Sequence, residues 1–455
     1  MGHLAVVRNN RWMVTRDIID LDVTDVAHGG VFVGRHEGRV VFVPDALPAE
    51  RVRVRLTDTA KSSFWRGEVL EVRDASPHRR AHVWRAADLD TPPEERPGGA
   101  DFGHIAVAEQ RRLKQHVLED ALQRFGGVEV SVPVAGASAD ADGRGETPDA
   151  LGWRTRVSLH VDDEGRIGPF AARSHRVVAV DDLPLATPAV ERAAARLHAT
   201  APGRIDLVQP ADGRVRILPR PGDVGGRRGG PRRSGARSTA PDARHDKARE
   251  VVIERVGDRE FRVDAGGFWQ VHRLAAASLS QLVSVALADA VDPDAWHLDL
   301  YGGVGLFAAT LATLGGAGTR VTSVESDARA SEHAGTNLAE WLGSRVETGR
   351  VDRWLRDTAS TASATERERL ARGVVLLDPP RSGAGRDVVR SIAHLGPERV
   401  AYVACDPVAL ARDVSTFRAE GYDLERIDAV DLFPHSHHVE ALAVLRRVAP
   451  IGSAK

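Results

Sequence analysis

The sequence predicts an α/β protein in three parts: a small all-β barrel, a β-rich central region, and a doubly wound α/β domain. From residue 256 onward, apolar runs that end in Gly, Pro or acidic residues alternate with helical stretches. This rhythm is typical of a parallel sheet covered by helices. Residues 14–75 instead alternate apolar and polar positions between closely spaced turns. The chain has 455 residues, which is room for about three domains.

The segment 14–75 predicts about five short strands, which close most simply into a barrel. Three arginines fall on one strand face by the two-residue period: Arg51, Arg53 and Arg55. A basic and aromatic cluster, which we expect in a loop, follows them: Lys61, Phe64, Trp65 and Arg66. Aromatic rings stack on unpaired bases and arginine binds phosphate, so one interpretation is an RNA-binding surface. A solvated strand face with core aromatics is equally open.

The middle of the chain, residues 76–255, predicts a central α+β region. An amphipathic pattern over 108–125 predicts a helix, and alternating segments follow it. Residues 220–250 are rich in Arg and Gly and poor in apolar side chains, so we expect a disordered insert there. A solvated loop is the favoured interpretation of this insert, and an arm that binds phosphate is the alternative.

Composition excludes several classes of protein. With 62 basic and 64 acidic residues the net charge is −2, so bulk attraction to nucleic acid is not expected. The single cysteine, Cys405, excludes a disulfide within the chain and any all-cysteine metal site. There is no apolar run of about 18 residues, so we expect no membrane span. We expect a cytoplasmic monomer.

A glycine loop marks the first candidate ligand site. A predicted strand ends at Asp299, and Gly302, Gly303 and Gly305 then open a helix, which lets the backbone approach a ligand closely. Glu325 ends the next strand, where a carboxylate can accept both hydroxyls of a ribose. A dinucleotide, another nucleotide, S-adenosylmethionine and a plain tight turn all stay open on this pattern.

Two further motifs follow predicted strands at the same sheet edge. Asp378 ends a buried strand before the rigid pair Pro379-Pro380, so its carboxylate faces the ligand crevice unless it only caps a turn. Cys405 ends another strand, and a helix begins after it at Pro407. A helix N-terminus favours the thiolate, which makes Cys405 a candidate nucleophile, whereas a buried apolar cysteine is the alternative.

The last motif gathers three histidines and a carboxylate: His435, His437, His438 and Glu440. Because the segment leads straight into a strand, neighbouring side chains point in alternate directions, and converging metal ligands are not expected. We therefore predict no metal site. Glu440 is a candidate general base close to Cys405, and a surface carboxylate is the alternative.

Taken in order, five motifs resemble the RNA uridine-C5 methyltransferase family. They are FWQVH, LDLYGGVG, DPPRSG, ACDPVALARD and FPHSHHVE. The resemblance implies a Rossmann-like methyltransferase domain over 256–455 that uses S-adenosylmethionine. Residues 14–75 resemble a TRAM domain, the RNA-binding barrel that ribosomal members of the family carry and the tRNA T-loop member usually lacks. The resemblance therefore favours a 23S ribosomal RNA substrate over tRNA.

The resemblance also assigns roles to individual residues. Cofactor binding falls on Gln270, Tyr301, Gly303, Glu325 and Asp378. Cys405 would add to C6 of the uracil, which makes C5 reactive toward a methyl group, and Glu440 would then remove the C5 proton. An exocyclic-amine methyltransferase stays open because the Asp-Pro-Pro motif also occurs in such enzymes. A non-catalytic RNA-binding protein with a degenerate enzyme core stays open as well.

Several positions depart from the family pattern. Many members bind an iron–sulfur cluster, but Pro97–Ala100 and Leu183-Pro184 stand where its cysteine ligands would fall, so we expect none here. His272 and Asp406 each replace the usual Asn, and a carboxylate at 406 would oppose formation of the Cys405 thiolate. Gly302 replaces a Cys, which we expect to leave the chemistry intact.

Overall fold

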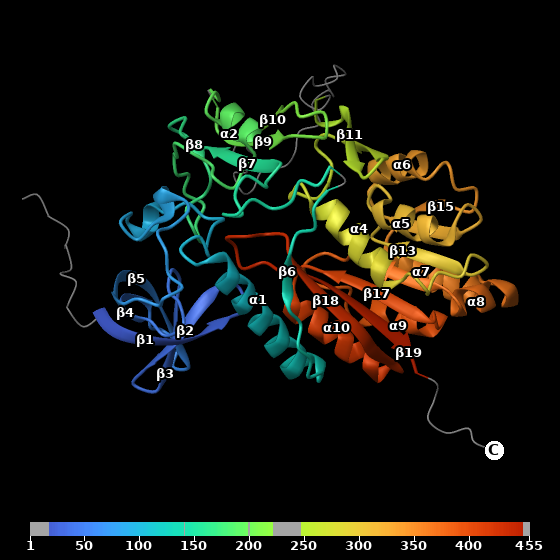
Figure 1. The fold of residues 1–455 in the computed structure, drawn as a ribbon, viewed down its shortest axis with the longest axis horizontal. Helices are drawn as coiled ribbons and strands as arrows, with labels where there is room; N and C mark the ends of the chain where they lie inside the picture. Colours follow the sequence, from blue (N-terminus) through green and yellow to red (C-terminus); the bar gives the residue numbers. More distant parts are fainter. Residues whose placement is uncertain (1–17, 141, 199–200, 222–246, 449–455) are drawn as a thin grey trace, which may run out of the picture.

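The computed structural model describes residues 18–140, 142–198, 201–221 and 247–448, which form three β-containing parts (Figure 1). A closed barrel lies on one side, a small sheet lies above it in the view, and an eight-stranded sheet with helices on both faces forms the other side. The predicted fold class is confirmed. Residues 14–17 and 449–455, which begin and end the predicted domains, lie outside the described part.

The N-terminal barrel closes with the strand order β1-β2-β3-β5-β4. Its strands are β1 (Ile18–Ala27), β2 (Val31–His36), β3 (Arg39–Val43), β4 (Arg51–Asp58) and β5 (Phe64–Asp74). Apolar residues such as Phe32, Val41 and Val52 are fully buried inside it. The alternating pattern that predicted these strands therefore separates a packed interior from a polar outer face, where Arg51 and Arg53 are exposed.

Three members of the basic and aromatic cluster of the barrel lie on a strand, and Lys61 lies in the loop before it. Phe64 begins β5, and Trp65 pairs with Val41 of β3 in a parallel ladder. The expectation of a loop is therefore confirmed for Lys61 and wrong for Phe64, Trp65 and Arg66, which the ladder with β3 includes in β5. Lys61 Nζ lies 4.6 Å from the centre of the Phe64 ring, so the cation–π contact expected of such a cluster is present.

The central region contains one long helix and a small antiparallel sheet. The helix α1 (Val107–Ala121) continues into a π-helical turn (Leu122–Gly126), which confirms the predicted helix. The small sheet has the order β10-β9-β7-β8, from β7 (Arg156–Val161), β8 (Ile167–Gly168), β9 (Gly203–Val208) and β10 (Arg216–Pro221). Short elements complete the region: η2 (Arg85–Ala87), η3 (Pro93–Glu95), α2 (Pro188–Ala194), and the hairpin β11 (Val251–Val256) with β12 (Arg259–Asp264).

Most of the predicted disordered insert at 220–250, residues 222–246, lies outside the described residues. At its ends the prediction is wrong. Arg220 belongs to β10, and its Nε donates to Asp206 at 2.6 Å. Glu250 accepts from Arg216 at 3.0 Å. Strand pairing and these ion pairs order residues that composition alone assigned to the insert.

The large sheet has the order β15-β14-β13-β16-β17-β19-β18-β6. Its strands are β6 (Val134–Gly136), β13 (Trp296–Leu300), β14 (Arg320–Glu325), β15 (Arg345–Thr348), β16 (Val374–Leu377), β17 (Arg399–Ala404), β18 (Tyr422–Asp431) and β19 (Glu440–Arg447). The strands from β15 to β17 run parallel, and β19 is antiparallel to both of its neighbours. Chain order reverses between β13 and β16, where ligands bind in open α/β sheets.

Helices cover both faces of the large sheet. One face packs on α1 together with α7 (Val351–Thr361), α8 (Ala364–Ala371), α9 (Arg386–Leu395) and α10 (Pro407–Ala419). The other face packs on α4 (Ala275–Ala286), α5 (Leu306–Gly315) and the end of α6 (Ala328–Asn337). The strands between them are continuous apolar runs such as VVLL of β16, because both sides are buried.

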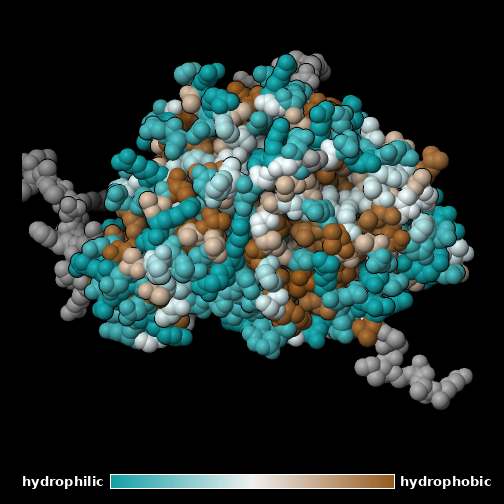
Figure 2. Space-filling model, viewed as in Figure 1, coloured by the Kyte–Doolittle hydropathy of each residue, from teal (hydrophilic) through white to brown (hydrophobic). Residues whose placement is uncertain are grey.

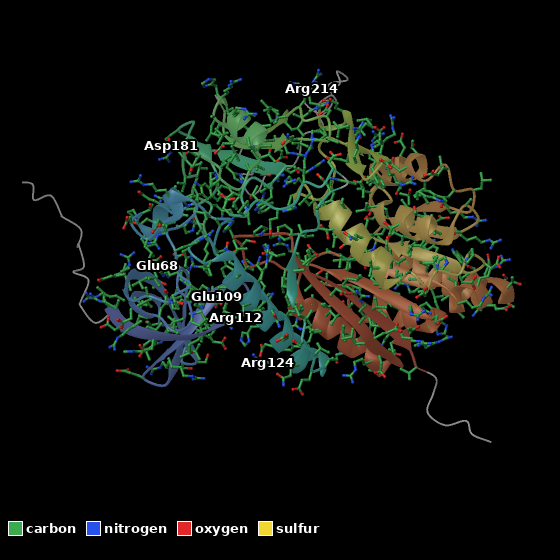
Figure 3. All side chains as sticks on the ribbon, viewed as in Figure 1. Glu68, Glu109, Arg112, Arg124, Asp181 and Arg214 are labelled. Atoms are coloured by element: carbon green, nitrogen blue, oxygen red, sulfur yellow. The ribbon has the colours of Figure 1, made fainter. Side chains whose placement is uncertain are left out.

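The surface of the view in Figure 1 is mostly hydrophilic. Figure 2 shows hydrophobic residues gathered around α4 and the adjoining part of the large sheet. Arg112 on α1 and Arg124 on its π-helical extension are exposed (Figure 3). Each pairs with an acidic residue of α1, Glu109 and Asp120 respectively. No helix among the described residues combines the length and the apolar character needed to cross a bilayer.

Candidate active site

The carboxyl ends of four parallel strands bring most of the predicted site residues to one edge of the large sheet. Glu325 is the last residue of β14, and Asp378 and Cys405 directly follow β16 and β17. Tyr301 directly follows β13. Because these strands are neighbours in the sheet, the motifs that are separate in the sequence meet at the point where the strand order reverses.

The glycine loop after β13 is held by Asp299. Its Oδ2 accepts from the backbone N of Ala308 at 3.0 Å and from Ser323 Oγ at 3.3 Å. A Cβ on Gly302 would lie 2.0 Å from that same Ser323 Oγ. In this chain glycine is therefore required at 302 by the serine of the next strand, which the sequence motif alone did not reveal.

Glu325 connects the glycine loop to the loop that follows β14. Its Oε2 accepts from the backbone N of Gly303 at 3.1 Å, and its Oε1 accepts from the backbone N of Asp327 at 2.7 Å. Beside it, Tyr301 adopts a left-handed backbone with φ of 62°, a conformation that is rare for a residue with a side chain and is often found at functional sites. Burial raises the pKa of Tyr301 to about 12, so its hydroxyl stays protonated.

A cavity of about 530 Å³ opens next to Tyr301. Its lining comes from the segments that follow β13, β14 and β15, including Ser326, Arg350 and Asp352, and from residues 384–388 at the start of α9. This is the side of the site where Glu325 would meet a ribose. The size and position of the cavity fit an adenosine group.

Two carboxyl groups lie at the base of the site, with Asp299 fully buried and Asp378 half-buried. Burial and the proximity of Asp299 raise the pKa of Asp378 to about 7. Burial likewise raises the pKa of Asp299 to about 7, against the hydrogen bond from Ala308. The Oδ1 atom of Asp299 is buried and has no hydrogen-bond partner among the described residues. A cation would relieve this crowding of acidic groups, so the residues present fit the sulfonium of S-adenosylmethionine.

The register of the large sheet brings Cys405 and Glu440 together. The ladder between β17 and β19 ends at the pair Ala404 and Ala441, so the next residues, Cys405 and Glu440, lie opposite each other. Glu440 is 6% exposed, so the alternative of a surface carboxylate is wrong. Cys405 is half-buried. A candidate nucleophile and a candidate base therefore meet at the end of the crevice.

Both of these groups favour their neutral forms in the absence of a ligand. Burial and the nearby Asp378 raise the pKa of Glu440 to about 8. Burial and the nearby Glu440 raise the pKa of Cys405 to about 12. Arg381 opposes both shifts. Burial and the neighbouring carboxyl groups therefore oppose the thiolate that the helix N-terminus favours.

A second cavity, of about 190 Å³, lies between the barrel and the catalytic edge. Residues from three parts of the chain line it: His28, Gly30, Lys114, Arg381, Cys405 and His437. No pattern in the sequence indicates that residues of the barrel and of α1 line this cavity. The Gly-Gly pair after β1 indicated only a tight turn, and Lys114 lies on a helix with ordinary amphipathic spacing.

Asp406, which replaces the usual Asn, makes three hydrogen bonds. Its Oδ1 accepts from the backbone N of Val408 at 3.1 Å and of Ala409 at 2.8 Å, so it caps α10. Its Oδ2 pairs with Nε2 of His28 in the barrel at 2.9 Å. Partial burial raises the pKa of Asp406, whereas the hydrogen bonds from His28 and from the backbone of α10 lower it. The hydrogen bonds together outweigh burial, so the pKa of Asp406 is lowered overall.

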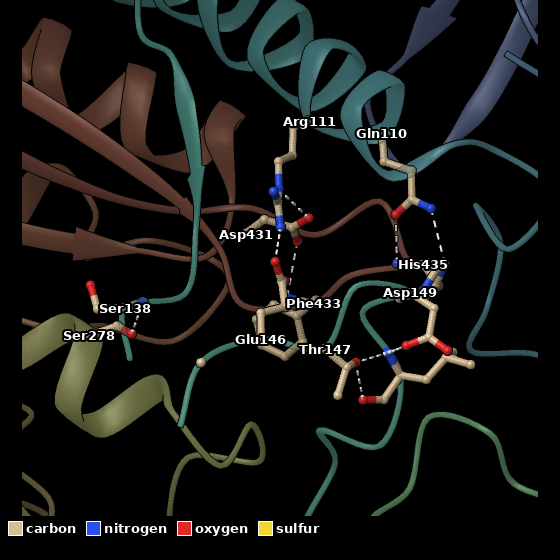
Figure 4. Close-up of polar contacts among 12 residues, drawn as sticks. Gln110, Arg111, Ser138, Glu146, Thr147, Asp149, Ser278, Asp431, Phe433 and His435 are labelled. Carbon is tan, nitrogen blue, oxygen red and sulfur yellow. Dashed lines mark hydrogen bonds and ion pairs between the residues drawn. The ribbon is translucent and has the colours of Figure 1, made fainter. Parts of the chain in front are cut away.

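The histidines of the last motif bind protein groups. His435 accepts from the amide of Gln110 at Nδ1 (3.0 Å), while its backbone N donates to Gln110 Oε1 at 2.7 Å (Figure 4). Its Nε2 lies 2.8 Å from the carbonyl of Asp149. Nδ1 of His437 binds Asp101, and Nε2 of His438 lies 3.2 Å from Arg381. Each ring therefore has a side-chain partner that fixes its orientation.

A buried ion pair connects α1 to the segment that carries these histidines. Lys114 Nζ lies 2.5 Å from Asp431 and donates to the carbonyl of Phe433 at 3.0 Å. Arg111 also approaches Asp431, at 3.6 Å, and pairs with Glu146 (Figure 4). Removal of one partner of such a buried pair typically costs about 3–5 kcal/mol. The pair therefore fixes the loop before Glu440.

Two residues of the FWQVH motif differ in their surroundings. Gln270 is half-buried in the loop between β12 and α4. His272 stacks on Trp153 with ring centres 5.3 Å apart, and its Nδ1 accepts from the backbone N of Leu274 at 3.1 Å. Burial lowers the pKa of His272 to about 3, so the ring is neutral. Its replacement of Asn is thus accommodated by packing.

The positions where the resemblance would place cluster ligands are apolar. Ala100 and Leu183 are buried in one hydrophobic cluster with Trp84 and Trp153. The indole nitrogen of Trp84 donates to Asp182 at 2.8 Å, next to Leu183. Ala100 and Leu183 therefore contribute to hydrophobic packing, and neither has a thiolate that could bind a cluster.

Comparison with known families gives two matches. Residues 255–448 match the model of the tRNA (uracil-5-)-methyltransferase family, and residues 14–70 match the TRAM domain. An RNA methyltransferase of Streptomyces avermitilis, described as uncharacterized, is 36% identical over 94% of this chain and 98% of its own length. A similarly described RNA methyltransferase of Bifidobacterium longum is 35% identical over 92% of this chain and 95% of its own length.

A solved structure shares the arrangement of the parts. The tRNA (uracil-54, C5)-methyltransferase of Pyrococcus abyssi, in complex with S-adenosyl-L-homocysteine, superposes with a TM-score of 0.62. The match covers 94% of this chain and all of that one, at 20% sequence identity, and so it supports the fold. With the relatives at 35–36% identity over nearly full length, the chain belongs to the tRNA (uracil-5-)-methyltransferase family of RNA methyltransferases.

Proposed function

We propose that the protein transfers a methyl group from S-adenosylmethionine to C5 of a uridine in RNA. The observation that carries this proposal is the pair Cys405 and Glu440, opposite each other at the end of β17 and β19 and next to the cofactor crevice. A nucleophile that lines a cavity and a base opposite it at the end of the neighbouring strand match a reaction that saturates and then restores a pyrimidine ring.

The reaction needs Cys405 and Glu440 in sequence. The thiolate of Cys405 forms a bond to C6, and the electron pair of the C5–C6 double bond moves toward C5 and O4. S-adenosylmethionine supplies the methyl group that C5 takes up. Glu440 then removes the remaining proton from C5, the double bond re-forms, and the thiolate leaves C6. No metal and no iron–sulfur cluster takes part.

The cofactor side of the site falls on residues at three strand ends. Glu325 binds the ribose hydroxyls, and Tyr301 and Gly303 border the adenosine group. Asp378 stabilises the sulfonium, and Gln270 completes the site from the hairpin side. The raised pKa values of Asp299 and Asp378 support this assignment, because a positive ligand would stabilise the charged forms of both carboxyl groups.

The neutral forms of Cys405 and Glu440 in the free protein are consistent with this reaction. With a pKa of about 12, Cys405 is protonated in the free protein, and Glu440, at about 8, is mostly protonated at neutral pH. Binding of the cationic cofactor next to Asp378 lowers both values. The nucleophile is therefore activated only when the methyl donor is in place.

The target is proposed to be ribosomal rather than transfer RNA. The support is the N-terminal barrel, whose TRAM match covers residues 14–70 and whose exposed face carries Arg51 and Arg53. We propose a cytoplasmic monomer that acts on a uridine in a loop or flipped from a stack.

The test is incubation with labelled S-adenosylmethionine and total RNA from a strain that lacks the gene. The modified position is then mapped by nuclease digestion and mass spectrometry. We expect 5-methyluridine at one site in 23S ribosomal RNA with the native protein and none with Cys405→Ala. A methyl group on an exocyclic nitrogen, or full activity of Cys405→Ala, would overturn the proposal.

A further inference from the structure

Two adjacent histidines, His437 and His438, line the cavity of about 190 Å³. The side-chain partner of His437 accepts a hydrogen bond, and that of His438 donates one. Nδ1 of His437 binds Oδ2 of Asp101, and the backbone N of His437 donates to the same oxygen at 3.3 Å. A carboxylate only accepts, so Nδ1 carries the proton. In the neutral ring, Nε2 of His437 is then an acceptor.

His438 has the reverse arrangement. Nη2 of Arg381 lies 3.2 Å from its Nε2. A guanidinium only donates, so Nε2 is the acceptor and Nδ1 carries the proton. Burial lowers the pKa of His438 to about 3, which keeps the ring neutral. Nδ1 of His438 is therefore a donor.

The two rings border the same space as the nucleophile. Their centres are 4.0 Å apart, and both residues line the cavity that also contains Cys405. The barrel fixes one of them from behind, because a Cβ on Gly30 would lie 2.6 Å from Cβ of His437. The ring with a free acceptor nitrogen and the ring with a free N–H donor therefore both line the cavity that contains Cys405.

We propose that His437 and His438 read the edge of the target uracil, with His437 accepting from N3–H and His438 donating to O4. This rests on the proposed function. Uracil presents a donor at N3 next to an acceptor at O4, whereas cytosine presents an acceptor at N3 next to an amino donor. The histidine pair is complementary to uracil and opposes cytosine at both positions.

His437 and Asp101 are not among the residues that the family motifs assign. The pattern F-P-H-T-x-H-V-E leaves the position of His437 open, and Asp101 lies outside every motif. Asp101 is a positioning residue in this proposal, because it sets the proton on His437 without touching the base. His437 is the residue that contacts substrate and determines specificity.

The experiment measures kcat/KM on a synthetic RNA fragment that spans the mapped uridine. The fragment carries uridine, cytidine or N3-methyluridine at that site. His437→Ala is expected to lower kcat/KM for uridine about 10- to 100-fold, the usual effect of a lost hydrogen bond to substrate. The value for N3-methyluridine, which has no N3–H, should hardly change, so the ratio between the two substrates also falls about 10- to 100-fold.

Asp101→Asn gives a second and sharper test. The amide of Asn can donate to Nδ1 and so move the proton of His437 to Nε2, where it faces N3–H of uracil. The ratio of kcat/KM for uridine over cytidine should fall at least about tenfold, which simple loss of structure would not produce. Equal losses on all three fragments with both variants would overturn the proposal.

The barrel contact has a matched control. Gly30→Ala and Gly38→Ala place a Cβ on residues with similar backbones, φ of 72° and 79°, but only the first meets another side chain, that of His437. Gly30→Ala should lower the ratio of uridine to N3-methyluridine, and Gly38→Ala should not. If the native protein methylates no uridine, the proposed function fails; if it does and these ratios stay constant, only the present inference fails.

Discussion

Nε2 of His28 in the N-terminal barrel lies 2.9 Å from Oδ2 of Asp406, the residue that follows Cys405. The turn that carries the candidate nucleophile is therefore joined directly to the barrel. Asp406 raises the pKa of His28 through their hydrogen bond, and the pair is partly exposed. The barrel thus takes part in the geometry of the catalytic edge.

His28→Ala is expected to lower methyl transfer several-fold while it changes stability little. A pair this exposed contributes at most about 1 kcal/mol to the free energy of unfolding. His116→Ala is the matched control, because His116 also joins the barrel to the rest of the chain through an exposed pair of the same length, with Asp25. Activity and urea unfolding are measured for both, and equal loss of activity would show that the Asp406 contact has no special role.

Gly302→Ala is expected to destabilise the protein by about 1–3 kcal/mol, because the new Cβ would collide with Ser323 Oγ. Ser323→Ala in the same chain removes that oxygen and should restore part of the loss, a coupling of about 1 kcal/mol in a double-mutant cycle. Gly335→Ala, in open space on α6, is the control and should be neutral or slightly stabilising. Additive effects at 302 and 323 would contradict the steric explanation.

The reactivity of Cys405 should depend on the charge of the bound cofactor analogue. Since Cys405 is the single cysteine and its pKa is about 12, alkylation by iodoacetamide at pH 8 should be slow in the free protein. Sinefungin, which carries an amine in place of the sulfonium, should accelerate alkylation about tenfold, one unit of pKa. S-adenosylhomocysteine, with a neutral sulfur, should not. Equal rates with both ligands would contradict electrostatic activation.

Asp299→Asn should change the pH dependence of stability. Burial raises the pKa of Asp299 to about 7, so the folded protein holds a proton there that the unfolded chain releases near pH 4. The free energy of unfolding therefore falls as pH rises from about 4 to about 7, by roughly 1.4 kcal/mol per pH unit at most. Asp299→Asn has no titrating group at this position, so its free energy of unfolding does not fall for this reason. The difference in the free energy of unfolding between the variant and the native protein should therefore shift in favour of the variant from about pH 4 to about pH 7. A difference that is independent of pH would contradict the assignment.

The large sheet and its site could be predicted because each motif directly follows a buried strand. Asp378 and Cys405 end apolar runs of four or more residues, and parallel strands deliver their carboxyl ends to one edge. The collision that a Cβ on Gly302 would make with Ser323 could not be predicted, because the two residues are 21 positions apart in the sequence. Gly302 follows β13, and Ser323 lies on β14. The same holds for the contacts of His28 and Lys114, which depend on how the barrel and α1 dock.

The helix N-terminus after Cys405 favours the thiolate, and of the carboxyl groups that oppose it the sequence indicated only Asp406. The thiol is half-buried and lies near Glu440, Asp378 and Asp406, which come from three different elements and all oppose the thiolate. A helix end offers a partial charge, and several carboxyl groups at short range outweigh it. Such a balance is set by tertiary structure and has no counterpart in a sequence motif.

The most direct measurement of the central claim, that Cys405 and Glu440 act on the same uracil, uses Glu440→Gln with labelled RNA and S-adenosylmethionine. Without the base, the C5 proton stays and the thiolate cannot leave. The account predicts a protein–RNA complex that survives denaturing electrophoresis and whose crosslinked peptide contains Cys405 and a methylated uracil. Turnover by Glu440→Gln at the native rate with no such complex would contradict it.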